Sequence, residues 1–169
     1  IAPPQLPAHW DRAETVTISF GHGIAVAPLQ FAAAAAALVN GGYQVTPTYL
    51  KRAPPTAGER TRIISAKTSA RIRELMRRNV EEPGGTGRRA ATDGYRIGGK
   101  TGTAELAVKG GYDKRAVLSS FLAAFPIDAP RYLTLVLIFE PKPTAEAGGV
   151  TGGLTAAPAQ FLGLDALGV

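Results

Sequence analysis

The 169 residues fit one domain, or a large part of one, and 45% of them are hydrophobic, which excludes wholesale disorder. No cysteine is present, so neither a disulfide framework nor a thiolate metal site can form. The formal net charge of +6 is compatible with nucleic acid, anionic lipid or an anionic polymer as partner. Because the arginines are densest over residues 71–89, where a helix is expected, we favour a solvated helix face and no nucleic-acid partner.

The chain contains no apolar run of the about 20 residues needed to cross a bilayer. Its longest candidate, residues 24–39, is interrupted by Pro28 and Gln30. The first residues, IAPPQLPAHWD, include no Met and no leader peptide, and they resemble a connection within a longer chain. We therefore interpret the sequence as a fragment.

The first half of the chain favours two helices separated by irregular segments. Pro28 suits a first helical turn, and strong helix formers continue to Val39, followed by Asn40-Gly41-Gly42 as a stop. Ser65 can cap a second helix, in which Ile72, Leu75, Met76 and Val80 share one face. Before the first helix, residues 1–14 are expected to be irregular, residues 15–20 alternate briefly like a strand, and residues 21–23 form a turn. Between the two helices we expect an edge strand over 43–50 and a turn over 54–60.

The second half favours strands. Residues 95–106, 116–125 and 132–139 are predicted strands, with turns over 109–114 and 126–131. The run 133–139 is apolar throughout, so both of its faces should be covered. A loop over 141–153 leads to a final helix over 156–167, with Phe161, Leu162 and Leu164 near its packing side. Adjacent strands with short links predict an α+β fold, an antiparallel sheet flanked by helices, without internal repeats.

The stretch GYRIGGKTGT, residues 94–103, satisfies two patterns at once. Residues 94–101 match the phosphate-binding P-loop G-x-x-x-x-G-K-[ST]. That loop requires a buried strand before Gly94 and a helix beginning at Lys100, but residues 84–93 are polar and Gly102 is a poor first-turn residue. A P-loop NTPase is therefore the weaker alternative.

The same stretch contains Lys-Thr-Gly, the element found in serine β-lactamases and penicillin-binding proteins. On this interpretation residues 96–105 form an edge strand along a cleft, and Gly98, Gly99 and Gly102 permit close approach of an extended substrate. Lys100 supplies positive charge for a substrate carboxylate, and the hydroxyls of Thr101 and Thr103 are hydrogen-bond donors. A backbone N–H of the strand can face the oxygen that becomes negative during acyl transfer.

The surrounding sequence resembles class B penicillin-binding proteins, especially those of the cell-division type. The similarity runs in order through nearly the whole chain. The matching pieces are 8–10 (AHW), 17–23 (TISFGHG), 26–39 (VAPLQFAAAAAALV), 40–42 (NGG), 83–87 (PGGTG), 94–105 (GYRIGGKTGTAE), 119–126 (SSFLAAFP) and 130–139 (PRYLTLVLIF).

The resemblance implies the transpeptidase fold shared with serine β-lactamases, a five-stranded antiparallel sheet flanked by helices beside an all-helical subdomain. It implies serine acyl transfer that cross-links peptidoglycan stem peptides at D-Ala-D-Ala during division, inhibited by β-lactams, without metal or cofactor. Lys100, Thr101, Gly102 and Thr103 would form the carboxylate-binding and oxyanion strand, with the Thr103 N–H as oxyanion donor. The parent protein would be anchored at the periplasmic face of the inner membrane and would contact divisome proteins.

Two elements of that family are absent. None of the serines at 19, 65, 69, 119 and 120 has a lysine three residues later, so there is no Ser-x-x-Lys nucleophile motif, and Ser-x-Asn is also missing. Since acylation needs the nucleophile and its base together, we expect this chain to be inactive alone. A non-catalytic envelope interaction module is the third hypothesis. His22 could act as a base near the cleft, but a structural hydrogen bond is the favoured role.

Overall fold

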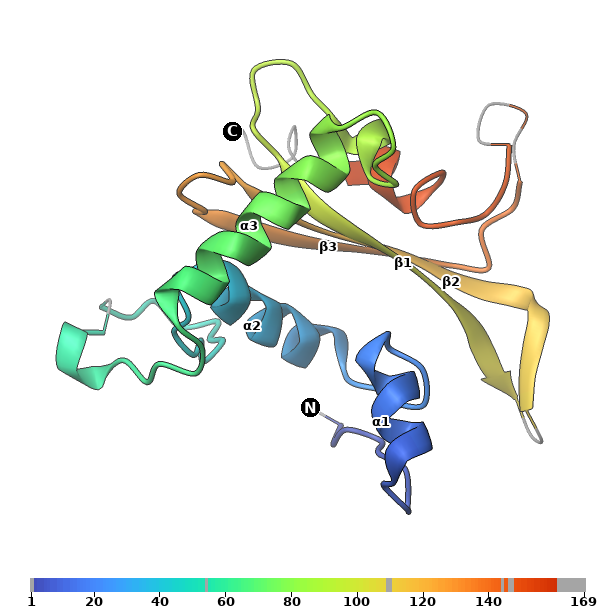
Figure 1. Cartoon of the computed structure of the whole chain (residues 1–169), viewed down its shortest axis with the longest axis horizontal. Coiled ribbons are helices and arrows are strands. Elements are labelled where there is room, and N and C mark those ends of the chain that lie inside the picture. Colours follow the sequence, from blue (N-terminus) through green and yellow to red (C-terminus); the bar gives the residue numbers. More distant parts are fainter. Residues whose placement is uncertain (1, 54, 109–110, 144, 146–147, 161–169) are drawn as a thin grey trace.

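The computed structural model describes residues 2–53, 55–108, 111–143, 145 and 148–160, and Figure 1 shows their arrangement. Within these residues, three α-helices precede a three-stranded antiparallel sheet whose strand order is β1-β2-β3. The predicted α+β class is confirmed.

Helix α1, Arg12–Ser19, was not anticipated. Asp11 is its N-cap, accepting the Ala13 N–H at 2.6 Å, while the Glu14 carboxylate accepts the Asp11 N–H at 3.2 Å. This reciprocal pair satisfies two backbone donors at the start of the helix. The strand-like alternation expected over 15–20 is therefore wrong, because the capping box selects helix over a weak period-two pattern. The predicted turn at 21–23 is confirmed, with positive φ at Gly21 and Gly23.

Helices α2, Pro28–Val39, and α3, Ala66–Glu81, begin at their predicted signals. Ser65 caps α3 by accepting the Thr68 N–H at 3.0 Å. Met76 and Val80 are buried as expected, but Leu75 is 57% exposed, so its assignment to the packing face is wrong.

The edge strand expected over 43–50 does not form. In the described part of this region, Tyr43 alone makes an isolated antiparallel bridge, to Arg62. The Gln44 N–H still donates to the Thr61 carbonyl at 2.9 Å, but residues 45–50 are exposed and belong to no strand, so nothing in the described chain offsets the entropy cost of an extended backbone there. The 3-10 helix η1, Ala57–Glu59, lies within the turn predicted over 54–60.

The sheet consists of β1, Gly98–Val108, β2, Gly111–Phe125, and β3, Tyr132–Phe139. In the register of β1 with β2, Thr101 pairs with Phe121 and Thr103 with Ser119. The short predicted link between β2 and β3 is confirmed. Strand β2 begins at Gly111, inside the turn expected over 109–114, while residues 109–110 lie outside the described residues. Strand β1 lies at one edge of the described sheet, as predicted, and β3 lies at the other.

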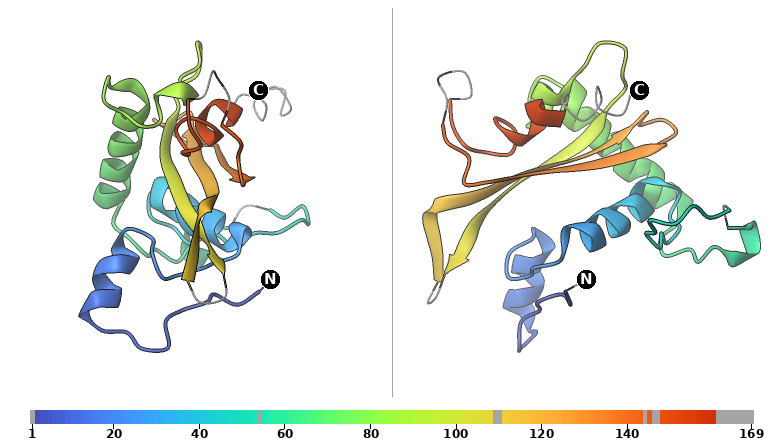
Figure 2. Two further views of the ribbon diagram at one scale, coloured as in Figure 1. Left: turned by 90° about the vertical axis from the view of Figure 1, so that its right-hand side faces the viewer. Right: turned by 180° about the vertical axis from the view of Figure 1, so that it is seen from behind.

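Hydrophobic side chains cover both faces of the sheet. On one face Phe121, Ala123 and Phe125 pack with Val80, Ile97 and the helical segment 156–160. On the other face Leu122 and Ala124 pack with α2, α3 and Ile127. Figure 2 shows the strands between α3 and the segment 156–160. The 3-10 helix η2, Arg88–Ala90, joins the first core through its buried alanine.

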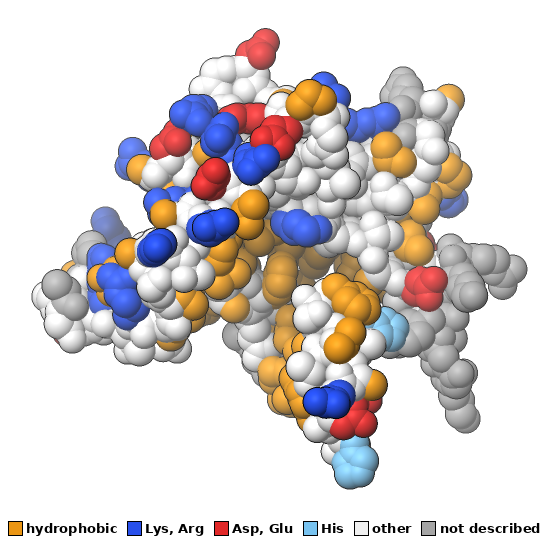
Figure 3. Space-filling model, in the orientation of Figure 1, with side chains coloured by type: hydrophobic (Ala, Val, Ile, Leu, Met, Phe, Trp, Pro, Cys, Tyr) orange, Lys and Arg blue, Asp and Glu red, His pale blue; other side chains and the backbone are white. Residues whose placement is uncertain are grey.

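Some hydrophobic surface remains uncovered. The expectation that both faces of 133–139 are covered is confirmed in part: Leu133 and Leu135 pack on one core and Val136 and Ile138 on the other, all half-buried, but Phe139 is 64% exposed. Exposed hydrophobic side chains also gather over α1 and the start of α2 (Figure 3), among them Trp10, Val16, Phe20 and Phe31. None of the helices in the described ranges has the length and apolar character required for a membrane span. The last part of the predicted C-terminal helix, including Phe161, Leu162 and Leu164, lies outside the described residues.

Candidate functional site

The open edge of β1 presents backbone groups that β2 does not use. The Gly99 carbonyl accepts Asn79 Nδ2 at 2.9 Å, and the Thr101 carbonyl accepts Lys100 Nζ at 2.6 Å. In an antiparallel strand the N–H and C=O of one residue point to the same side, and alternate residues repeat the direction. The N–H groups of Thr101 and Thr103 therefore face the same open edge as these two carbonyls.

Asn79, in the last turns of α3, connects this edge to the loop 83–87. Its Oδ1 accepts both the N–H and the hydroxyl of Thr86 at 3.0 Å, while its Nδ2 binds the Gly99 carbonyl. The Thr86 hydroxyl lies 2.8 Å from the Thr101 hydroxyl. One carboxamide thus holds a loop, a helix and the Lys-Thr-Gly strand together.

A second loop, residues 150–153, reaches the strand farther along. The Gly152 N–H donates to Thr103 Oγ1 at 3.0 Å, and the fully buried Ser119 donates its hydroxyl to the Val150 carbonyl. A Cβ on Gly152 would lie 2.4 Å from the Gly102 carbonyl oxygen. Only glycine allows this backbone to approach β1 so closely.

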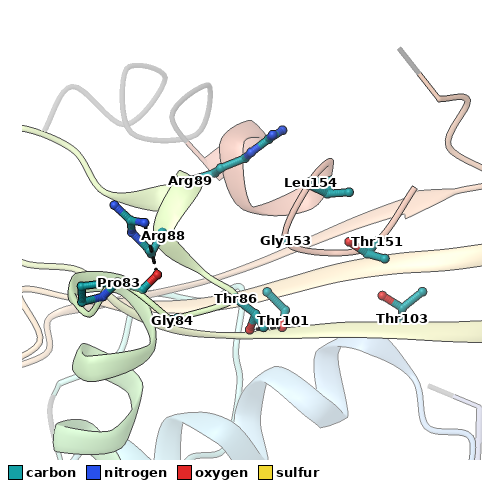
Figure 4. A pocket seen from close by; sticks show the side chains of 11 residues that line it. Pro83, Gly84, Thr86, Arg88, Arg89, Thr101, Thr103, Thr151, Gly153 and Leu154 are labelled. Atoms are coloured by element: carbon teal, nitrogen blue, oxygen red, sulfur yellow. Dashed lines mark hydrogen bonds between the residues drawn. The ribbon is translucent and has the colours of Figure 1, made fainter. Parts of the chain in front are cut away.

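A cleft of about 740 Å³ opens between these two loops above β1. Figure 4 shows the side chains of Thr86 and Thr101 together on its floor, with Thr103 farther along the strand near Thr151. The remaining lining residues are Pro83, Gly84, Gly85, Arg88, Arg89, Gly153 and Leu154. The lining residues include two arginines, four threonines and no acidic residue, which suits an anionic ligand, and the Arg88 guanidinium donates to the Pro83 carbonyl at 3.2 Å.

The structure separates residues that the sequence grouped. Thr101 and Thr103 line the cleft, but Lys100 and Gly102 alternate to the other face of β1, where they pair with Leu122 and Ser120. Lys100 remains exposed and folds back along the edge to reach the Thr101 carbonyl.

Internal packing gives the three strand glycines a reason that the sequence analysis did not consider, while close approach of a substrate stays a prediction. A Cβ on Gly98 would lie 2.5 Å from the Ile127 side chain, and one on Gly99 would lie 2.3 Å from the Phe121 ring. At Gly102 the obstacle is Ser120 Oγ, at 2.4 Å. Internal packing therefore requires Gly98 and Gly99, whether or not a substrate approaches, whereas at Gly102 the obstacle is a hydroxyl that can rotate.

The P-loop alternative is also wrong. A phosphate-binding loop places its Lys-Thr at the N-terminus of a helix, whose free N–H groups hold the phosphates. Here Lys100 and Thr101 lie inside β1, and the strand continues to Val108.

Asn79, Thr86 and Gly152 were missed as site residues. Thr86 lies in the matched piece PGGTG, but nothing assigned it a partner. Asn79 lies next to Val80 near the end of an amphipathic helix. Asparagine is a poor helix former, so its presence inside the helix was the one sequence signal that its side chain has a special role. The other sequence candidate, His22, is exposed on the loop after α1 and is not among the residues that line the cleft.

Comparisons with known proteins agree with this geometry. Residues 4–158 match the family model of the penicillin binding protein transpeptidase domain. The chain is 42% identical over 168 residues to the probable peptidoglycan D,D-transpeptidase FtsI of Caulobacter vibrioides (strain NA1000 / CB15N), covering 94% of this chain and 28% of that protein. It is 36% identical over 160 residues to the probable peptidoglycan D,D-transpeptidase PenA of Neisseria flavescens, covering 95% of this chain and 39% of the relative.

Among solved structures, the chain is similar to the apo TP domain of Burkholderia pseudomallei penicillin-binding protein 3. The TM-score is 0.74 at 34% sequence identity, over 95% of this chain and 48% of that one. The chain thus spans less than half the length of each of these three proteins. It belongs to the penicillin binding protein transpeptidase family, as part of a class B transpeptidase domain similar to FtsI and PenA.

Proposed function

We propose that this chain is the portion of a peptidoglycan D,D-transpeptidase that supplies the carboxylate-binding and oxyanion strand. In the parent protein, a serine outside these residues attacks the carbonyl of the terminal D-Ala-D-Ala bond. The C–N bond breaks, D-Ala leaves as the amine, and an amine of a second stem peptide then displaces the serine from the acyl group. The cross-link belongs to cell-wall synthesis at division.

The observation that carries this proposal is the open edge of β1. The Thr103 N–H faces that edge, where the negative oxygen of a tetrahedral intermediate can accept it. Thr101 and Thr103 line the adjacent cleft, whose threonine hydroxyls and arginine residues suit the C-terminal carboxylate of the peptide. Lys100 adds positive charge along the same edge and helps to organise proton transfer. β-Lactams carry a carboxylate and an acyl group in a comparable arrangement and would use the same groups.

The exposed hydrophobic surface supports an incomplete domain. Helix α1 has no buried residue, while Val16 is 63% and Phe20 73% exposed. Large apolar patches on a folded protein mark surfaces that another element covers. The preceding part of the transpeptidase domain, with the nucleophile, is the occupant we propose. The parent would be anchored by an N-terminal segment at the periplasmic face of the inner membrane and would contact divisome proteins there.

Fluorescent penicillin tests the proposal. The full-length parent should become covalently labelled, and this chain alone should not, because acylation needs the serine and its base. Labelling of the isolated chain would contradict the missing nucleophile. An unlabelled parent would favour a non-catalytic envelope module.

A matched pair of variants at Thr103 tests the oxyanion assignment in the parent. Thr103→Pro removes the N–H on the side of β1 that does not pair with β2, where proline is tolerated, whereas Thr103→Val keeps it. We expect the proline variant to acylate about 100-fold more slowly than the valine variant. Equal rates in two folded variants would remove Thr103 from this role.

A further inference from the structure

The orientation of the Asn79 carboxamide is determined by its partners. The backbone N–H of Thr86 can only donate, so the atom that it meets at 3.0 Å is Oδ1. The Gly99 carbonyl can only accept, so the atom that it meets at 2.9 Å is Nδ2. The two contacts agree on one orientation of the amide.

This orientation decides where the threonine protons point. Oδ1 carries no proton, so the Thr86 hydroxyl must donate in its 3.0 Å contact with Asn79. A hydroxyl has a single proton, and Thr86 has then used it. In the 2.8 Å contact between Thr86 and Thr101, the donor is therefore Thr101.

The Thr103 hydroxyl has the opposite hydrogen-bond role, because it accepts a bond where the Thr101 hydroxyl donates one. The Gly152 N–H donates to Thr103 Oγ1 at 3.0 Å, so this bond engages a lone pair of Thr103 and leaves its proton unused. The two cleft-lining hydroxyls of the strand consequently differ. Thr101 presents lone pairs to the cleft, while Thr103 can donate.

We propose that Asn79 and Thr86 are positioning residues. Because Thr86 accepts the hydroxyl proton of Thr101, Thr103 is the strand hydroxyl that donates to a ligand carboxylate. Thr86 competes with the carboxylate for that proton. The inference rests on the proposed function for its ligand, but the hydrogen-bond polarity itself does not. It also revises the expectation that both hydroxyls are donors to the ligand.

The isosteric change Thr86→Val tests the competition. It removes the hydroxyl that accepts the Thr101 proton, while the Thr86 N–H continues to bind Asn79. Thr101 can then donate to a carboxylate in the cleft, in a hydrogen bond assisted by charge. In the full-length parent we expect the second-order rate constant for acylation by benzylpenicillin to rise roughly fivefold.

The methyl ester of benzylpenicillin separates this effect from a general structural one, because it lacks the carboxylate. Its acylation rate should be unchanged by Thr86→Val. Thr103→Val should slow the free acid roughly tenfold, and Thr86→Val in that background should recover part of the loss. Thr46→Val is the matched control, since Thr46 is exposed on the loop between α2 and η1. Equal effects on acid and ester, or no increase with the acid, would overturn the competition.

Neutron diffraction of the deuterated parent provides a readout independent of activity. The expected result is a deuteron on Thr101 directed at Thr86 Oγ1 and one on Thr86 directed at Asn79. A Thr86 deuteron directed at Thr101 would overturn the inference even if the parent reacts with penicillin. The expected polarity in a parent that fails to react would instead contradict the proposed function alone.

Discussion

Gly99 allows a direct measurement of what the strand glycines do. A Cβ at this position would lie 2.3 Å from Phe121 Cζ, whereas nonbonded carbons settle at about 3.5 to 4 Å. The ring would have to move by more than about 1 Å. Phe121 is fully buried against Val80, Ile97 and the segment 156–160, so it has little room to do so. We expect Gly99→Ala to destabilise the fold by about 2 to 3 kcal/mol, in the upper part of the range for overpacking, and to lower Tm by about 4 to 12 °C.

Thermal unfolding followed by circular dichroism measures the effect. Gly58→Ala is the matched control, because a Cβ there would meet nothing within 4 Å. Phe121→Leu in the Gly99→Ala background should recover part of the loss, since leucine leaves the position of Cζ empty, and a double-mutant cycle gives the coupling. An unchanged Tm for Gly99→Ala, together with slow acylation in the parent, would refute internal packing and restore substrate approach as the reason for this glycine.

Three further predictions concern helix α3, the loop 150–153 and the pKa of Glu59 in η1. Met76→Ala should lower the free energy of unfolding by about 2 to 4 kcal/mol, because the Met76 side chain is only 8% exposed. Leu75→Ala should change it by no more than about 0.5 kcal/mol, because Leu75 is 57% exposed. Urea unfolding of both variants measures this difference, and equal losses of stability would contradict it. Ser119→Ala should lower the free energy of unfolding by about 1 to 3 kcal/mol and speed amide hydrogen exchange in the loop 150–153, because the Val150 carbonyl loses its hydrogen-bond donor. Unchanged exchange would show that this hydrogen bond does not hold the loop. Hydrogen bonds from the Thr56 hydroxyl, and to a smaller extent from the Thr56 N–H, lower the pKa of Glu59 in the folded chain. Their contribution to folding stability is therefore complete above the unfolded-state pKa and is lost as the pH falls through the folded-state pKa. An NMR titration of Glu59 should show a higher midpoint in Thr56→Val than in the unaltered chain, and an unchanged midpoint would contradict this cause.

Local signals in the sequence were sufficient for the two long helices. Pro28 and Ser65 mark starts that the structure confirms, because caps and first-turn residues act within one turn of the helix. The same kind of signal was overlooked at Asp11, where the capping box with Glu14 outweighs an alternating pattern. The strand predicted from Tyr43 does not form for a different reason: strand propensity depends on a partner, and among the described residues the pairing is limited to the bridge between Tyr43 and Arg62 and the neighbouring bond from the Gln44 N–H to the Thr61 carbonyl.

The network around the cleft could not be predicted in the same way. Asn79 binds a residue seven positions later and another 20 positions later, and both distances depend on how α3 docks against β1. The sequence does identify Thr101 and Thr103 through a short motif, because that motif lies on one strand. It cannot show that Thr86 engages one of these hydroxyls and Gly152 the other, since these contacts arise only when three separate segments meet.

Glycines allow these three segments to meet, because they let the main chains of the segments approach one another closely. A Cβ on Gly85 would lie 2.0 Å from the Asn79 carbonyl oxygen, and one on Gly153 would lie 2.3 Å from that of Thr86. A Cβ on Gly152 would similarly strike the carbonyl of Gly102. Flexible side chains could move away from such contacts, but these obstacles are backbone atoms of helix α3, strand β1 and the loop 83–87. The separation between the loops 83–87 and 150–153 is therefore determined by main-chain packing against α3, against β1 and between the loops themselves. A cleft of this kind keeps its donors in place before a ligand arrives, which is the condition under which a backbone N–H stabilises a developing oxyanion effectively.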